Sequence, residues 1–201
     1  MREPPLTLGF EDEPEPDLDE RPTTRRPART AAPTAAAATS GFVVRTDGAA
    51  RGNPGPASAG AVLISLARPD ARDPLATPDA SISDYLGVQT NNVAEYTAVV
   101  RGIALAQDLG ARRVELLLDS KLIVEQLMGR WRVKDMKLRP LWAEALQRLR
   151  TLPDGWAAAH VPRAQNSLAD AMCNEAIDRV MAGGPASVVR RPPREGRGSL
   201  R

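Results

Sequence analysis

The most constraining feature of the sequence is an apolar run that ends in an aspartate and passes at once into a turn-rich loop. Residues 42–56 read FVVRTDGAARGNPGP, in which the valines favour a buried strand and the later glycines and prolines cannot continue it. Asp47 is therefore expected where a central strand leaves the core, a common place for chemistry in open α/β sheets. An aspartate before a glycine is also an ordinary turn signal, so Asp47 taken alone has a purely structural explanation as well.

Length and composition indicate one folded domain between two tails. Residues 1–40 hold an acidic cluster and then a segment rich in proline, alanine and arginine, with too few core-forming side chains to offset the entropy of ordering. Residues 183–201 are short and basic. We therefore predict disordered tails at residues 1–40 and 183–201 and a folded domain at residues 41–182.

The cysteine content and the hydropathy restrict the cellular location that the sequence predicts. A single cysteine, Cys173, excludes an internal disulfide framework and a zinc cluster of several thiolates. No stretch approaches the roughly 18 apolar residues of a membrane span, and the N-terminus has no long apolar run. We expect a cytoplasmic monomer without membrane association.

The hydrophobic pattern predicts five strands and four helices. The strands are expected at residues 42–47, 57–66, 81–89, 113–118 and 155–161, and the helices at residues 92–109, 120–128, 138–152 and 166–181. Three early strands in hairpins, followed by two strand–helix units, indicate an α/β domain. Its mixed five-stranded sheet has three antiparallel and then two parallel strands, flanked by helices.

Four acidic residues stand out by their joint placement. Asp47 and Asp119 end apolar strands, while Glu95 and Asp170 lie in the first turns of helices. If the two strands are parallel and adjacent, all four carboxylates can converge at one edge of the sheet. Each residue also has an ordinary explanation; Glu95, for example, completes a capping-box pattern with Asn92.

Such a cluster needs a counter-charge, because the carboxylates repel one another and the sequence offers no evident side-chain cation to neutralise them. A divalent cation would do so. Ligands that are all oxygen suit Mg²⁺ or Mn²⁺ rather than zinc. Two such ions about 3.5–4 Å apart form a clamp for in-line phosphoryl displacement.

Four segments resemble type 1 ribonuclease H, in the order that the family has them. They are TDGAARGNPGPASAG (46–60), TNNVAEYTAVVRGIALA (90–106), LLLDSKLIVEQL (116–127) and HVPRAQNSLADAMCNEA (160–176). The resemblance spans about residues 42–181. It implies a ribonuclease H-like fold and an endoribonuclease that cuts the RNA strand of an RNA/DNA hybrid with two metal ions, leaving 3′-hydroxyl and 5′-phosphate ends.

The resemblance also assigns roles to individual residues. It implies that Asp47, Glu95, Asp119 and Asp170 are the catalytic, metal-binding carboxylates. Asp47 would bridge two Mg²⁺ or Mn²⁺ ions, of which one activates the attacking water and the other stabilises the leaving 3′-oxygen. The implied substrate contacts are Asn53, Thr90, Asn91, Asn92, Ser120, Lys121, Trp131 and Asn166. Contacts of this kind distinguish RNA by its 2′-hydroxyl groups.

Two departures from the family pattern leave alternatives open. Many members have a long basic handle rich in tryptophan, whereas this chain has only the stretch 129–137, in which Trp131 either contacts the DNA strand or is simply half-buried. Many members also carry a histidine in the loop before the last carboxylate, and the loop at 162–165 has none. The single histidine, His160, ends the preceding strand and is either structural or a catalytic auxiliary.

Three functions of different classes compete at this stage. The leading one is a hybrid-specific endoribonuclease. A non-catalytic hybrid-binding module is the second, although a binder has little reason to keep a self-repelling carboxylate cluster. Another nuclease of the same fold, such as a transposase or an exonuclease, is the third, but those superfamilies lack the segments around residues 52–56 and 91–95.

Overall fold

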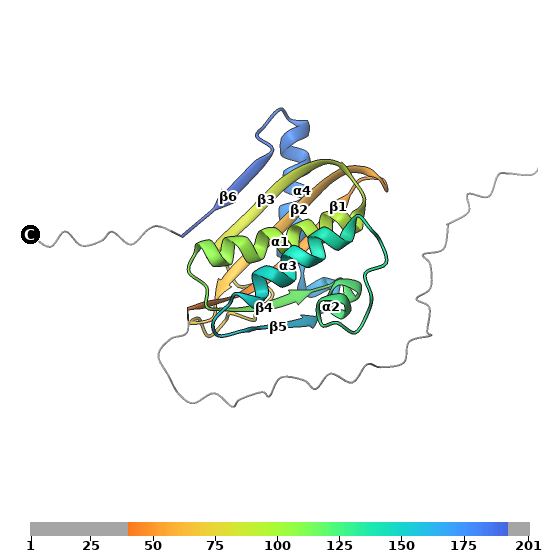
Figure 1. Ribbon diagram of the computed structural model, residues 1–201. Coiled ribbons are helices and arrows are strands. Elements are labelled where there is room, and N and C mark those ends of the chain that lie inside the picture. Colours follow the sequence, from red (N-terminus) through yellow and green to blue (C-terminus); the bar gives the residue numbers. More distant parts are fainter. Residues whose placement is uncertain (1–39, 193–201) are drawn as a thin grey trace, which may run out of the picture. The chain divides into compact units, whose positions relative to one another are not determined.

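The computed structural model describes residues 40–192, so the predicted tail at 1–40 falls outside the described residues apart from Ser40. Figure 1 shows the ribbon. The strands are β1 (Gly41–Ala50), β2 (Gly55–Ser65), β3 (Ala80–Gln89), β4 (Arg113–Leu118), β5 (Trp156–His160) and β6 (Ser187–Arg190). The helices are α1 (Asn91–Asp108), α2 (Lys121–Leu127), α3 (Leu138–Arg150) and α4 (Ser167–Met181), with a short 3-10 turn at Arg163–Gln165.

The strands form one mixed sheet in the order β5-β4-β1-β2-β3-β6. β1 is parallel to β4, β4 is parallel to β5, and the other neighbouring strands are antiparallel. The predicted sheet is confirmed in its mixed character, and β1 and β4 are the parallel neighbours that the convergence of the carboxylates requires. Parallel neighbours bring their carboxyl ends to the same edge of the sheet.

Helices cover the two faces of the sheet, and glycines let them approach closely. A β-carbon at Gly102 of α1 would lie 2.9 Å from a methyl of Val44 and 3.0 Å from one of Thr46. A β-carbon at Gly60 of β2 would lie 2.4 Å from the Ala169 carbonyl of α4. Since Gly60 and its neighbour Ala61 point to opposite faces, α1 and α4 lie on opposite sides, as in Figure 1.

Most of the core lies on the α1 face. There, aliphatic side chains of β1 to β4 pack against α1, α2 and α3 around the fully buried Tyr96, whose hydroxyl donates to Gln126. A smaller cluster lies on the other face, where Val43 and Ile64 are covered by the loop between β2 and β3. Within residues 40–192, no helix has the length and apolar character that a bilayer span requires.

The sixth strand, β6, corrects the prediction of five. It lies in the segment 183–201, which composition predicted to be a disordered tail, and it pairs antiparallel with β3. Its four residues, SVVR, bury little apolar surface, so hydropathy gives almost no sign of the strand. Residues 193–201 lie outside the described part of the chain.

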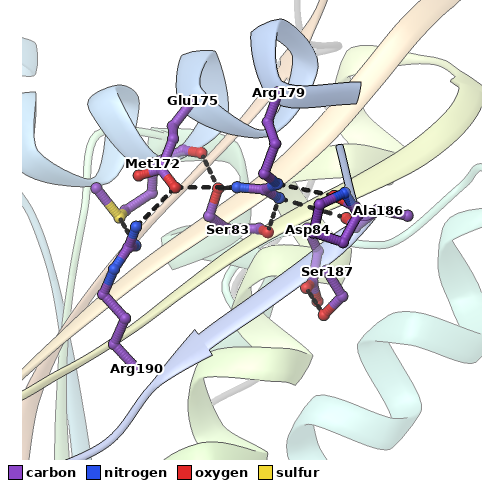
Figure 2. A network of polar contacts seen from close by, with 9 residues as sticks. Ser83, Asp84, Met172, Glu175, Arg179, Ala186, Ser187 and Arg190 are labelled. Carbon is purple, nitrogen blue, oxygen red and sulfur yellow. Dashed lines mark hydrogen bonds and ion pairs between the residues drawn. The ribbon is translucent and has the colours of Figure 1, made fainter. Parts of the chain in front are cut away.

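Polar contacts on both faces of β3 fasten β6 to the sheet (Figure 2). On the α4 face, the Arg179 guanidinium donates to the Ser83 carbonyl at 2.6 Å and to the Pro185 carbonyl at 2.8 Å. On the α1 face, the Ser187 hydroxyl donates to the buried Asp84, which also forms an ion pair with Arg101. The strand is therefore held by hydrogen bonds rather than by apolar burial.

These contacts predict that a fragment ending at residue 182 is less stable than one ending at residue 192. Removing residues 183–192 takes away the Ser187 donor from Asp84 and a backbone acceptor from Arg179. Asp84 keeps its ion pair with Arg101 and Arg179 keeps its bond to Ser83, so each loss is one hydrogen bond to a charged group, about 1.5–3 kcal/mol. Thermal melts of fragments 41–182 and 41–192 test this, and equal melting temperatures would mean that β6 adds no stability.

Candidate active site

The ends of β1 and β4 place two of the predicted carboxylates side by side. Thr46 pairs with Leu118 in the parallel ladder, so Asp47 and Asp119 are the next residues on neighbouring strands. On the opposite side of β1, pairing with β2 continues past Asp47 to Ala50. Asp47 is thus within a strand, and the explanation that it merely caps a turn is wrong.

The other two carboxylates come from helices that approach β1 closely. Glu95 lies in the first turns of α1, where a β-carbon on Gly48 would be 2.0 Å from the Glu95 amide nitrogen. Asp170 lies in the first turn of α4, and one turn later the Cys173 thiol donates to the Asp47 carbonyl at 3.0 Å. Thr90, not Asn92, caps α1, so Glu95 has no capping-box role.

A cleft of about 310 Å³ opens at this edge of the sheet. Three of the carboxylates line it, those of Asp47, Glu95 and Asp119. The other lining residues are Gly48, Ala49, Ala50, Asn91, Ser120 and Arg163. The cleft is therefore a polar, acidic cavity next to the predicted catalytic residues.

Three of the four carboxylates have a hydrogen-bonding partner of their own. The Asn91 amide donates to Glu95 at 2.8 Å, and the Asn166 amide donates to Asp119 at 2.7 Å. Arg163 forms a 3.3 Å ion pair with Asp170, which also accepts from the Asn174 amide. Within residues 40–192, no donor contacts the carboxylate of Asp47.

Asp47 consequently has the most perturbed carboxyl group of the cleft. Burial, together with repulsion from Asp119, Asp170 and Glu95, raises its pKa to about 7, against 3.8 for a free side chain. The Arg163 guanidinium opposes this rise only weakly. Burial also raises the pKa of Glu95, and hydrogen bonds from Ser120 and Asn91 oppose it. The cleft thus holds more negative charge than the chain neutralises.

This donor set fits a hard divalent cation in its chemistry. All the charged ligands are carboxylate oxygens, and Asp47, which has no hydrogen-bond donor in the described part of the chain, is the group most in need of a positive charge. In the part of the chain described, however, no three Asp, Glu, His or Cys side chains are already gathered in an arrangement that could hold a metal ion. Three of the carboxylates are instead bonded to Asn91, Asn166 and Arg163.

Arg163 is the residue of the site that the sequence analysis missed. It lies in the loop where many family members have a histidine, lines the cleft and pairs with Asp170, with 81% of its side chain exposed. The expectation that the sequence supplies no side-chain cation at the cluster is therefore wrong at Asp170, although Arg163 does not neutralise the cluster as a whole. A signal existed, since Arg163 is the one charged residue of the 162–165 loop.

The predicted contacts around the start of α1 lie together. The Asn53 side chain accepts from the Asn91 amide nitrogen at 3.2 Å, which ties the loop after β1 to the helix. Thr90 is the helix cap, Asn91 lines the cleft and Asn92 is exposed. These four residues thus form a continuous polar rim at the edge of the cleft.

A second group lies at the start of α2. Ser120 lines the cleft, and the Lys121 ammonium is 6.0 Å from the centre of the half-buried Trp131 ring. Next to the tryptophan, Arg130 forms an ion pair with Glu125. Trp131 is therefore half-buried, and part of one ring face is directed toward a cation.

The last two predicted residues, Asn166 and His160, lie beside Asp119. Asn166 is only 1% exposed, and its side-chain amide donates to the Thr46 carbonyl and to the Asp119 carboxylate. His160 is exposed, and its Nε2 lies 3.2 Å from the Asp119 carbonyl. Among the residues described, it is not part of the cleft lining.

Comparison with known proteins identifies the family. Residues 45–176 match the family model described as reverse transcriptase-like. The crystal structure of RNase H1 from Halobacterium salinarum superposes with a TM-score of 0.62 at 40% identity, covering 69% of this chain and 98% of that one. The chain belongs to the type 1 ribonuclease H family. The predicted ribonuclease H-like fold is confirmed.

Two other ribonuclease H structures also match the chain. The N-terminal RNase H domain of Rv2228c from Mycobacterium tuberculosis matches with a TM-score of 0.61 at 40% identity, covering 69% of this chain and 99% of that domain. LC11-RNase H1 in complex with an RNA/DNA hybrid matches with a TM-score of 0.58 at 34% identity, covering 70% and 99%. Relative to whole proteins the match is partial, since it spans 35% of Rv2228c and 62% of Halobacterium ribonuclease HI.

Proposed function

We propose that the chain is an endoribonuclease that hydrolyses the RNA strand of RNA/DNA hybrids with divalent metal ions, leaving 3′-hydroxyl and 5′-phosphate ends. One observation carries the proposal: three acidic residues of the ribonuclease H motifs, Asp47, Glu95 and Asp119, line one cleft, and the last two, together with the nearby Asp170, raise the pKa of Asp47. The complex of LC11-RNase H1 with an RNA/DNA hybrid supports the substrate class.

Asp47, Glu95, Asp119 and Asp170 would hold two Mg²⁺ or Mn²⁺ ions. When bound, such ions lower the pKa of a water nucleophile and stabilise the leaving oxygen. The chain itself orients the ligands, since Asn91 holds Glu95. Arg163 contributes a positive charge at Asp170, where a phosphate of the scissile strand would approach.

The residues around the cleft suit recognition of a sugar–phosphate backbone. The rim formed by Asn53, Thr90, Asn91 and Asn92 offers amide and hydroxyl groups, which bond to phosphates and 2′-hydroxyls without reading base edges. Arg132 and Lys134 are exposed next to Trp131 and add an electrostatic attraction that is independent of sequence. Cleavage is therefore expected to be nearly independent of sequence, and affinity to fall as salt rises.

A cleavage assay with matched substrates tests this function. One labelled RNA strand, paired with DNA and separately with RNA, and the same sequence as duplex DNA are incubated with Mg²⁺ or Mn²⁺. We expect cutting only of the RNA strand opposite DNA, and none after chelation of the metal. Mapping the ends of the products checks for the 3′-hydroxyl and the 5′-phosphate.

Two outcomes of this assay contradict the proposal in different ways. Equal cutting of duplex RNA would mean that the DNA-strand contacts assigned to Thr90 and Trp131 do not control specificity. Binding of the hybrid without cutting by either metal would favour a hybrid-binding module instead.

A further inference from the structure

Arg45 is a buried cation next to the candidate active site that the proposed chemistry does not use. It lies in β1 two residues before Asp47 and is 1% exposed, the one buried lysine or arginine among residues 40–192. Its neighbours in the strand, Val43 and Val44, are fully buried and apolar. Burial lowers the pKa of Arg45, with Asp73 opposing. Burying a guanidinium without a bonded carboxylate is costly, so this position calls for an explanation.

The contacts of Arg45 join β1 to two loops. Nη1 donates to the Gln165 carbonyl at 2.8 Å, and Nη2 donates to the Arg72 carbonyl of the β2–β3 loop at 2.8 Å. Its Nε has no hydrogen-bonding partner within the described chain. The guanidinium is thus bonded to backbone on both sides, an arrangement that fixes loops in place rather than neutralising a charge.

The residues that follow Arg45 and Gln165, Thr46 and Asn166, are also bonded to each other. Arg45 donates to the backbone of residue 165, and the side chain of Asn166 donates to the backbone of Thr46 at 2.9 Å and to the Asp119 carboxylate at 2.7 Å. Two consecutive residues of β1 are therefore bonded reciprocally to two consecutive residues of the 163–166 turn. Since both partners of the Asn166 amide group are acceptors, the orientation of that amide is determined.

The two bonds between β1 and the 163–166 turn, Arg45 to Gln165 and Asn166 to Thr46, are called the clasp below. Residues of the candidate active site adjoin the clasp. The turn carries Arg163, which reaches Asp170, and it leads directly into α4, on which Asp170 lies. The side-chain amide of Asn166 donates a hydrogen bond to the Asp119 carboxylate. Both Nη atoms of Arg45 bond to backbone carbonyls, so its contacts act on the site through the position of the turn.

We propose that Arg45 is a positioning residue for the reaction: by binding the Gln165 carbonyl it fixes the 163–166 turn on β1, so that Asn166 orients Asp119 and Arg163 reaches Asp170. The inference rests on the proposed function for its kinetic consequence, but the placement of Asn166 is a structural property that can be observed without catalysis. Arg45 needs no contact with the substrate to act in this way.

The test compares Arg45→Met with Arg68→Met. Methionine fills the space of the buried arginine stem but donates no hydrogen bond. Arg68 holds the same β2–β3 loop through Asp70 and Asp79, without contact to the turn, and is therefore the matched control. Steady-state kinetics on a hybrid and the NMR signals of the Asn166 side-chain amide are measured for both variants and for the wild type.

We expect Arg45→Met to lower kcat about 10- to 100-fold with little change in KM, because small misplacements of catalytic groups have effects of this size. The Asn166 amide signals should move, and Arg68→Met should leave both kcat and these signals unchanged. If Arg45→Met does not fold, Arg45→Leu takes its place, since leucine also donates no hydrogen bond, and the same changes are expected.

Three results would overturn the proposal. They are a wild-type kcat in a folded Arg45 variant, Asn166 amide signals identical to those of the wild type, and an equal loss of kcat in Arg68→Met. A wild-type protein that cuts no hybrid would instead refute the proposed function, and the NMR comparison would then judge the clasp by itself.

Discussion

Replacing Asp47 by asparagine is expected to abolish hybrid cleavage and, in the same protein, to stabilise the metal-free fold above pH 7. Cleavage is lost because asparagine removes the charge of a carboxylate that would hold the metal ions. The fold gains because the ionised Asp47 is buried, repelled by three carboxylates and, within residues 40–192, without a hydrogen-bond donor. An amide of nearly the same shape removes this repulsion.

The pH dependence of the stabilisation follows from the pKa of Asp47. That pKa is about 7 in the folded protein, against 3.8 for a free aspartate, so the folded state holds its proton to higher pH than the unfolded chain. The protonated group carries no penalty below the unfolded value, and the penalty of ionisation grows as pH rises and is complete above the folded value. The Asp47→Asn variant avoids a penalty on the order of 2–4 kcal/mol above pH 7 and gains almost nothing near pH 4.

Thermal melts in the presence of a chelator, at pH values from 4 to 8, measure this difference. Asp178→Asn is the matched control, since Asp178 is an exposed carboxylate paired with Arg51 away from the cleft. Its loss is expected to cost about 0–1 kcal/mol and to leave cleavage intact. A clear destabilisation by Asp47→Asn at pH 8 would contradict the repulsion between the carboxylates.

The local sequence was sufficient to predict the bounds of those strands that are determined by burial and hydrophobic periodicity. β4 occupies Arg113–Leu118 as predicted, because Val114, Leu116 and Leu118 are buried on one face and Leu117 is half-buried on the other, which gives the run clear ends. β1 extends three residues beyond the predicted end at Asp47, since its ladder with β2 continues through Gly48 to Ala50. That extension depends on hydrogen bonds to another segment, which hydropathy does not report.

The parts that the sequence did not reveal depend on contacts between distant residues. Arg45 bonds to a carbonyl 120 residues later, and Arg179 to one 96 residues earlier. Backbone carbonyls are present at every position, so no residue type marks such an acceptor in advance. For the same reason, Asn166 was expected to face the substrate, although its partners are the Thr46 carbonyl and Asp119.

Replacing Gly48 by alanine is expected to damage both the fold and the site, because the backbones of β1 and α1 leave no room for a methyl group. A β-carbon there would lie 2.0 Å from the Glu95 nitrogen and 2.3 Å from the Ala94 carbonyl carbon. Both are backbone atoms, so α1 or β1 must move. We expect this to lower the free energy of unfolding by about 3 kcal/mol or more. Any such movement carries Glu95 away from Asp47, so kcat should fall together with the melting temperature.

Gly110→Ala is the control. Gly110 follows the C-terminal end of α1, whereas Gly48 of β1 contacts the N-terminal end of that helix. Gly110 has a φ of +81°, and a β-carbon added there would have nothing within 4 Å, so alanine meets only the strain of the left-handed backbone, about 1–2 kcal/mol. We expect that variant to melt earlier but to cleave the hybrid at the wild-type rate once folded. Gly48→Ala should instead lose kcat even at temperatures where it is fully folded. A folded Gly48→Ala protein with wild-type kcat would show that α1 and β1 can separate without disturbing the carboxylates, and that the close approach at Gly48 is not what positions Glu95.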